Sequence, residues 1–258
     1  MTGLKTAFPW YDSWWLTRYV RAKAFLADRH PGRLAAFEST IDPLRTRPDF
    51  HVQLPERFFN AVQTGVIRKA LREVGTAQLE SHELCAHGRF VVHDHPDLVA
   101  LQALAAAALG ELVGEKVDPA YSFIALYNRN GKCPVHLDAP VSKWTLDYCI
   151  EQSEPWPIHF SEVIEWPEAF DSGHEDWEGR IKHRLGHEFR AVEMEPGESV
   201  VFSGSSQWHY RDPFAGSNAR TRCDLLFMHF LPAGMQEVAE WKNWERLFAA
   251  PGLTAAVR

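Results

Sequence analysis

Several features are missing from this 258-residue sequence, and each absence argues against a class of protein. The longest apolar stretch is interrupted by Gln102 and Glu111, so no run approaches the roughly 18 residues that a membrane-spanning helix needs. The N-terminus lacks the basic head and apolar run of a secretory signal. No Walker A loop, dinucleotide fingerprint or basic–aromatic patch occurs. We therefore expect neither a membrane nor a nucleic-acid partner.

Cysteine and positive charge are also scarce. The cysteines show neither C-x-x-C spacing nor close pairing; they are Cys85, Cys133, Cys149 and Cys223. A disulfide framework is therefore not expected, and a reducing, cytoplasmic location fits. The 27 Lys and Arg residues are outnumbered by 34 Asp and Glu, and this net charge of −7 again disfavours nucleic acid or an anionic membrane.

What is present is the composition of a soluble globular protein. Hydrophobic residues make up 45% of the chain and charged residues 24%, with ten tryptophans and sixteen phenylalanines available for a core. No internal repeat or linker-like segment divides the chain. The sequence therefore predicts a single domain over residues 1–258.

The two ends of the chain show helical spacing of apolar residues. Within a mainly helical part, 1–118, this spacing predicts helices over 11–30, 54–75 and 95–115. The second of these has Pro55 at its start and Gly75 after its end, the usual signals of helix termini. A further helix is predicted in the C-terminal part, 234–258.

Between these parts the pattern changes to short, β-branched and aromatic segments separated by Gly, Pro, Asn and Ser. Seven such segments predict strands, at 121–129, 143–151, 157–166, 189–194, 198–204, 208–214 and 222–232. They favour an antiparallel β-sandwich or jelly roll over residues 119–233 rather than alternating βα units. The predicted fold class is therefore α+β, with the N-terminal helices packed on the double sheet.

A candidate metal site begins in the stretch "CPVHLDAP". His136 and Asp138 lie two positions apart, so an extended strand points both to one side, about 6.5–7 Å apart at Cα. His209, in "SSQWHYRDPF", supplies a candidate third ligand. Two imidazoles and one carboxylate leave open positions on the metal, as in non-haem Fe(II) oxygenases, whereas zinc sites usually have closed tetrahedral sets.

The same residues lie in a wider pattern. "HLD", about seventy residues of predicted strands and then "MEPGESVVFSGSSQWHYRDPF" together resemble the Fe(II)/2-oxoglutarate-dependent oxygenase superfamily over roughly 119–233. The resemblance implies a double-stranded β-helix (a cupin-like jelly roll) with Fe(II) held by His136, Asp138 and His209. It also implies 2-oxoglutarate as cosubstrate and O2 as oxidant. The expected reaction is oxidation, usually hydroxylation, of a small, amino-acid-like substrate with release of succinate and CO2.

The superfamily also needs a basic residue for the far carboxylate of 2-oxoglutarate. Arg211 is favoured because it follows His209 by two positions and so faces the same side of the strand. Arg222 is the alternative, placed opposite Arg211 if the chain forms a hairpin that turns near 215–218. Further candidates for the substrate pocket are Tyr127, Lys143, Trp144 and Trp208.

Other readings of these patterns stay open. One is a jelly-roll metalloenzyme that does not use 2-oxoglutarate, such as a cupin-like dioxygenase or isomerase, and another is a non-catalytic small-molecule binder.

A second H-x-D, His95-Pro96-Asp97, is explained by a proline at the first position of a helix. The sequence does not indicate the primary substrate or the oligomeric state.

Overall fold

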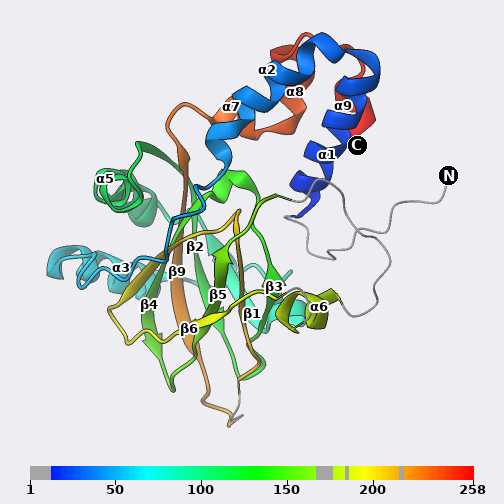
Figure 1. The fold of residues 1–258 in the computed structure, drawn as a ribbon. Coiled ribbons are helices and arrows are strands. Elements are labelled where there is room, and N and C mark those ends of the chain that lie inside the picture. The colour runs from blue at the N-terminus through cyan, green and yellow to red at the C-terminus, as the bar shows by residue number, and fades with distance from the viewer. Residues whose placement is uncertain (1–12, 167–176, 184–185, 215–217) are drawn as a thin grey trace.

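A computed structural model of the protein describes residues 13–166, 177–183, 186–214 and 218–258 (Figure 1). Its α-helices are α1 (Ser13–Arg29), α2 (Pro31–Ile41), α3 (Ala61–Glu73), α4 (Leu84–His87), α5 (Pro96–Val113), α6 (Trp177–His183), α7 (Gln236–Ala239), α8 (Trp244–Leu247) and α9 (Leu253–Val257). The short 3₁₀ helices are η1 (Asp42–Leu44), η2 (Thr76–Gln78), η3 (Pro140–Ser142) and η4 (Trp241–Asn243). The strands are β1 (Arg89–His93), β2 (Val117–Tyr127), β3 (Cys133–His136), β4 (Trp144–Gln152), β5 (Ile158–Val163), β6 (Arg190–Val192), β7 (Ser199–Ser203), β8 (Gln207–Arg211) and β9 (Cys223–Pro232).

The strands form two antiparallel sheets. One has the order β1-β2-β9-β4-β7 and the other the order β3-β8-β5-β6. Each of the seven predicted strand segments contains a strand, so the mixed helix and antiparallel-sheet content agrees with the predicted α+β class. Consecutive strands often lie in different sheets, as β8 and β9 do, and this crossing decides which side chains face one another.

Some helix boundaries differ from the prediction. The second helix begins at Ala61 rather than at Pro55, because the Asn60 side chain accepts hydrogen bonds from the backbone N–H groups of Val62 and Gln63 and so caps α3. The predicted C-terminal helix is divided into α7, η4 and α8. Glu240 ends α7 because its backbone is extended, and its side chain then caps η4 by accepting from the Lys242 N–H. The helix α2 was not predicted.

Helix α5 covers the outer face of the five-stranded sheet. Leu98, Leu101 and Leu109 are buried at helical spacing and pack with α3 against outward side chains of β2, β4 and β9. It is the one helix of the described residues whose length and hydropathy would suit a membrane span. Pro96 occupies its first turn, as predicted, and Asp97 is exposed beside Lys69 rather than at a ligand site.

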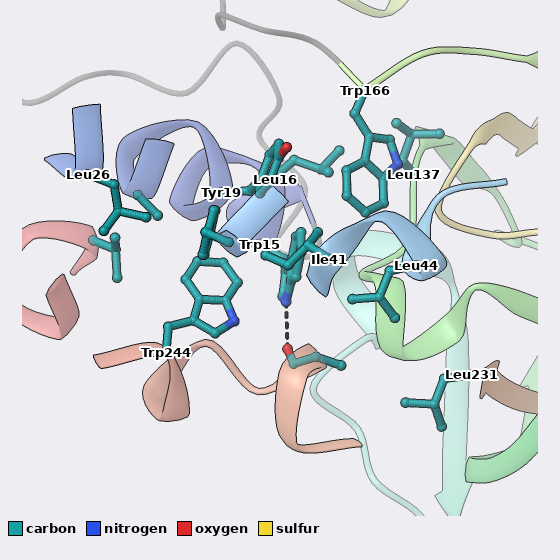
Figure 2. Packing of buried hydrophobic residues seen from close by; sticks show 14 of the residues in the cluster. Trp15, Leu16, Tyr19, Leu26, Ile41, Leu44, Leu137, Trp166, Leu231 and Trp244 are labelled. Carbon is teal, nitrogen blue, oxygen red and sulfur yellow. Dashed lines mark hydrogen bonds between the residues drawn. The ribbon is translucent and has the colours of Figure 1, made fainter. Parts of the chain in front are cut away.

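The helices of the two chain ends pack together beside the sheets (Figure 1). Figure 2 shows Trp15 and Tyr19 of α1 beside Trp244 of α8, with the Trp15 indole N–H donating to the carbonyl oxygen of Ala239 at 2.6 Å. The same apolar cluster reaches Trp208, behind the sheet that carries β3 and β8. The terminal helices therefore support one wall of the site described below.

Trp244 provides a test of this packing. Its side chain is fully buried, so Trp244→Ala should lower the free energy of unfolding by about 3–5 kcal/mol in a urea titration. Trp14→Ala, at a side chain that is 37% exposed, is the matched control and should change it by less than about 1 kcal/mol. Equal losses for the two variants would contradict the described packing.

Candidate metal centre

The three predicted metal ligands meet in space. His136 at the end of β3 and His209 in β8 are register partners, and their ring centroids are 4.1 Å apart. Asp138 Oδ1 lies 3.5 Å from His136 Nε2 and 3.9 Å from His209 Nε2. One ligand atom from each residue falls within 4.8 Å of the other two, which is close enough to surround a single cation.

Both imidazoles are oriented by backbone carbonyls. His136 Nδ1 lies 2.8 Å from the Pro134 oxygen, and His209 Nδ1 lies 3.0 Å from the Gln207 oxygen. A carbonyl oxygen only accepts, so each Nδ1 carries a hydrogen and Nε2 is the ring nitrogen that faces the other ligands. This is the usual support of a metal-binding histidine, and the donor set therefore fits a divalent ion such as Fe(II).

Asp138 is fixed by its own neighbours. Its backbone N–H donates to the Gly204 oxygen at 2.8 Å, and the Thr145 hydroxyl donates to Asp138 Oδ2 at 3.4 Å. Oδ1 is thereby left to face the two histidines. Asp138 is therefore positioned by two other segments of the chain, those of Gly204 and Thr145.

The protonation states of these three residues are compatible with the binding of a cation. Burial lowers the pKa of His209 to about 3, so this imidazole is neutral. Burial opposes ionisation of Asp138, but its hydrogen bond with His136 and the charge of His136 outweigh this and lower its pKa. Burial also opposes a charge on His136, yet Cys133 and Asp138 raise its pKa. One proton is therefore shared between His136 and Asp138, and a bound cation would replace it.

The three ligands line a cavity between the two sheets. Its empty space, counting the open mouth, is about 530 Å³. Tyr121, Phe123, Phe227 and His229 form the wall on the five-stranded sheet. Arg89, Tyr127 and Arg211 line the same cavity, and the β2–β9 register places Tyr127 at the end remote from Tyr121 and His229. Polar groups that converge beside an aromatic wall are typical of a small-molecule site.

Two buried guanidinium groups, each paired with a carboxylate, lie at the remote end. Arg211 donates to Asp147 Oδ2 at 2.7 Å and to the Trp156 carbonyl oxygen. Arg89 donates to Glu83 and to the Tyr127 hydroxyl. Burial raises the pKa of Tyr127, which keeps the phenol neutral and able to donate. These bonds use two of the five N–H donors of each arginine, so both retain donors for an anionic ligand.

The alternative arginine, Arg222, lies elsewhere. Its side chain is 60% exposed and pairs with Glu151 at 3.0 Å. The predicted hairpin that would place it opposite Arg211 is wrong, because β8 pairs with β3 and β5 whereas β9 belongs to the other sheet. Residues 215–217 of the predicted turn lie outside the described residues. Arg222 is therefore not a part of the cavity wall.

Three of the four predicted pocket residues also face away from the cavity. Lys143 is buried and donates to Glu115 Oε1 at 2.6 Å and to the Pro43 oxygen at 2.9 Å. Trp144 and Trp208 precede Thr145 and His209, which face the cavity, so alternation along a strand turns both indoles to the outer faces. Tyr127 does line the cavity.

The cavity residues that were not predicted include Arg89, Tyr121, Phe123, Phe227 and His229. Arg89 lies in β1, a strand absent from the prediction, although the aromatic and β-branched run in "GRFVVH" was a usable signal. His229 and Tyr121 lie in predicted strands and are register partners of one another. Their proximity could be recognised only from the order of the strands in the sheet.

Gly204 provides a test of how Asp138 is positioned. A Cβ at this residue would clash with Asp138 Oδ2 and would lie 2.6 Å from the Ser142 carbonyl oxygen. Gly204→Ala should therefore displace the carboxylate and weaken Fe(II) or Co(II) binding about 10–100-fold in an anaerobic titration. Gly65→Ala, where nothing lies within 4 Å, is the control and should bind metal as the wild type does. Unchanged affinity in Gly204→Ala would argue that Asp138 is not a ligand.

No family model and no curated protein matches the sequence. The fold, however, is similar to solved structures. SnoN, a non-heme alpha-ketoglutarate-dependent epimerase from nogalamycin biosynthesis, superposes with a TM-score of 0.54 at 14% identity, over 77% of this chain and 84% of that one. An oxidoreductase of the 2OG-Fe(II) oxygenase family from Burkholderia pseudomallei superposes with a TM-score of 0.50 at 12% identity, over 76% and 89%.

A third similar structure contains ligands. HygX from Streptomyces hygroscopicus, with nickel and 2-oxoglutarate bound, has a TM-score of 0.50 at 8% identity, over 71% of this chain and 83% of that one. Identities this low establish the fold alone. The chain has the fold of the 2-oxoglutarate–Fe(II) oxygenases and carries a His–Asp–His group, His136, Asp138 and His209, in the cavity between its two sheets.

Proposed function

We propose that the protein is a non-haem Fe(II)- and 2-oxoglutarate-dependent oxygenase that hydroxylates a small-molecule substrate with O2 and releases succinate and CO2. The observation that carries the proposal is the meeting of two carbonyl-oriented imidazoles and one carboxylate in a cavity that also contains two buried arginines. In this reading the two sheets form a double-stranded β-helix, and the whole chain is one domain. The free cysteines suit a reducing compartment such as the cytoplasm.

His136, Asp138 and His209 would hold the iron through two Nε2 atoms and Oδ1, leaving one side of the ion open. Iron with 2-oxoglutarate and O2 would supply the oxidising chemistry. The carbonyl bonds to both Nδ1 atoms keep the two rings in one tautomer and orientation. The protein's contribution is thus a rigid, deprotonated ligand set in a shielded space.

Arg211 is the proposed partner of the far carboxylate of 2-oxoglutarate. It lies on the same face of β8 as His209, and its guanidinium is fixed by Asp147 and by the Trp156 oxygen. A fixed guanidinium loses little conformational entropy when it binds a carboxylate. Arg89 and the Tyr127 hydroxyl line the same cavity and would strengthen this anion site.

The substrate is proposed only as a small molecule. The expectation of an amino-acid-like substrate relied partly on Lys143. This residue is paired with Glu115 outside the cavity and so does not support it. The aromatic wall of Tyr121, Phe123 and Phe227 would exclude water from the reacting carbon.

The proposal predicts a visible absorption band when Fe(II) and 2-oxoglutarate are added together without oxygen, because the keto acid then chelates the iron. Asp138→Ala should abolish the band, since it removes one of the three ligand groups. If Fe(II) binds and no band forms on adding 2-oxoglutarate, the cosubstrate is excluded. The alternative of a cupin-like dioxygenase or isomerase would then be favoured.

The cosubstrate site predicts a difference between two arginines. Arg211→Lys keeps a positive charge beside Asp147 but loses the bidentate fork, so the 2-oxoglutarate concentration for half-maximal band formation should rise about 10–100-fold. Arg222→Lys, at an exposed residue, should leave it unchanged. Melting temperatures of both variants verify folding. Equal behaviour of the two variants would contradict the assignment to Arg211.

A further inference from the structure

His229 brings a third imidazole to the cavity, beside those of the two proposed histidine ligands. It lies in β9, is 4% exposed, and lines the same space as His136 and His209. Its Nε2 atom is buried and has no hydrogen-bond partner among the described residues. Leaving a buried polar atom unpaired costs free energy, so such an atom in a cavity wall indicates a ligand contact.

The neighbours of His229 determine which nitrogen carries the hydrogen. Its Nδ1 lies 3.0 Å from Thr145 Oγ1. The one hydroxyl proton of Thr145 is directed to Asp138 Oδ2 at 3.4 Å or to the Ser142 oxygen at 3.5 Å, and both of these atoms only accept. Thr145 therefore accepts from the Nδ1–H of His229. Burial lowers the pKa of His229 to about 4, so the ring is neutral and Nε2 is a bare acceptor.

Stacked rings hold His229 in one orientation. The ring centroid of Tyr121 is 4.3 Å away and that of Phe123 is 5.5 Å away, at interplanar angles of 25° and 23°. Phe227 is nearly parallel to His229, at 7°. These rings occupy one face of the neighbouring strands β2 and β9, in direct register. The His229 ring is thus held in one orientation within a stack of apolar rings, and Thr145 links it to Asp138.

We propose that His229 Nε2 accepts a hydrogen bond from the primary substrate, which carries an O–H or N–H donor next to a flat apolar group lying on Tyr121, Phe123 and Phe227. The inference rests on the proposed function, because it places this donor beside the iron site. 2-Oxoglutarate is not the partner, since its carboxylates and ketone offer no donor at neutral pH. His229 is therefore a specificity-determining residue for a substrate alcohol or amine.

The experiment compares two probes that differ only in the donor, benzyl alcohol and benzyl methyl ether. Each is titrated anaerobically into protein loaded with Fe(II) and 2-oxoglutarate, and binding is followed through the change in the visible band. The wild type should bind the alcohol about fivefold more tightly than the ether, the ratio expected for one neutral hydrogen bond. In His229→Phe, which keeps a flat ring in the stack, the two affinities should become equal through weaker binding of the alcohol.

His51→Phe is the matched control. The His51 side chain is exposed and does not line the cavity, so this variant should keep the wild-type ratio. A second measurement needs no variant. In ¹⁵N-labelled wild type loaded with Zn(II) and 2-oxoglutarate, the His229 Nε2 resonance should be that of an unprotonated nitrogen and should shift with the alcohol but not with the ether.

Three results would overturn the inference: a wild type without preference for the alcohol, a preference that persists in His229→Phe, or a protonated Nε2. Failure of the visible band to form in the wild type is a separate result, because it rejects the proposed function itself.

Discussion

The candidate site depends on the pairing of β3 with β8. This pairing sets His136 directly opposite His209, although about seventy residues separate them in the chain. A register irregularity between Cys133 and His136 accompanies it, and the chain then leaves the sheet so that the Asp138 N–H reaches the Gly204 oxygen. A slip of one residue in this register would turn His136 away from the cavity and leave two potential ligands instead of three.

The alternation of side chains on the same strands separates the cavity from the core. On β4, Thr145 and Asp147 face inward while Trp144 and Leu146 pack toward α5. On β8, His209 and Arg211 face the cavity, whereas Trp208 joins the cluster that contains Trp15 and Trp244. Close apolar packing thus supports each wall on the side away from the cavity and holds the polar groups in place.

The sequence predicted the strands and the His–Asp–His group well, because both depend on local signals. Alternation marks a strand, and H-x-D with a distant W-H in a characteristic context marks the group. The prediction failed where the answer depended on topology. Arg222 was placed opposite Arg211 because adjacent strands usually form a hairpin, but the chain crosses to the other sheet after β8. Arg89 was missed because β1, an edge strand joined to β2, lies outside the segment that carries the motif.

Both arginines of the cavity are paired with acidic residues. Arg211 is paired with the fully buried Asp147, and Arg89 with Glu83, so two cations are buried without a large net charge. Burying an unpaired guanidinium would be strongly unfavourable, whereas burying one that is paired with a carboxylate costs much less. Asp147 shows the cost of this arrangement: burial raises its pKa despite Arg211, and its Oδ1 has no partner among the described residues. An anionic ligand at Arg211 would compete with Asp147 for the same positive charge and would raise that pKa further.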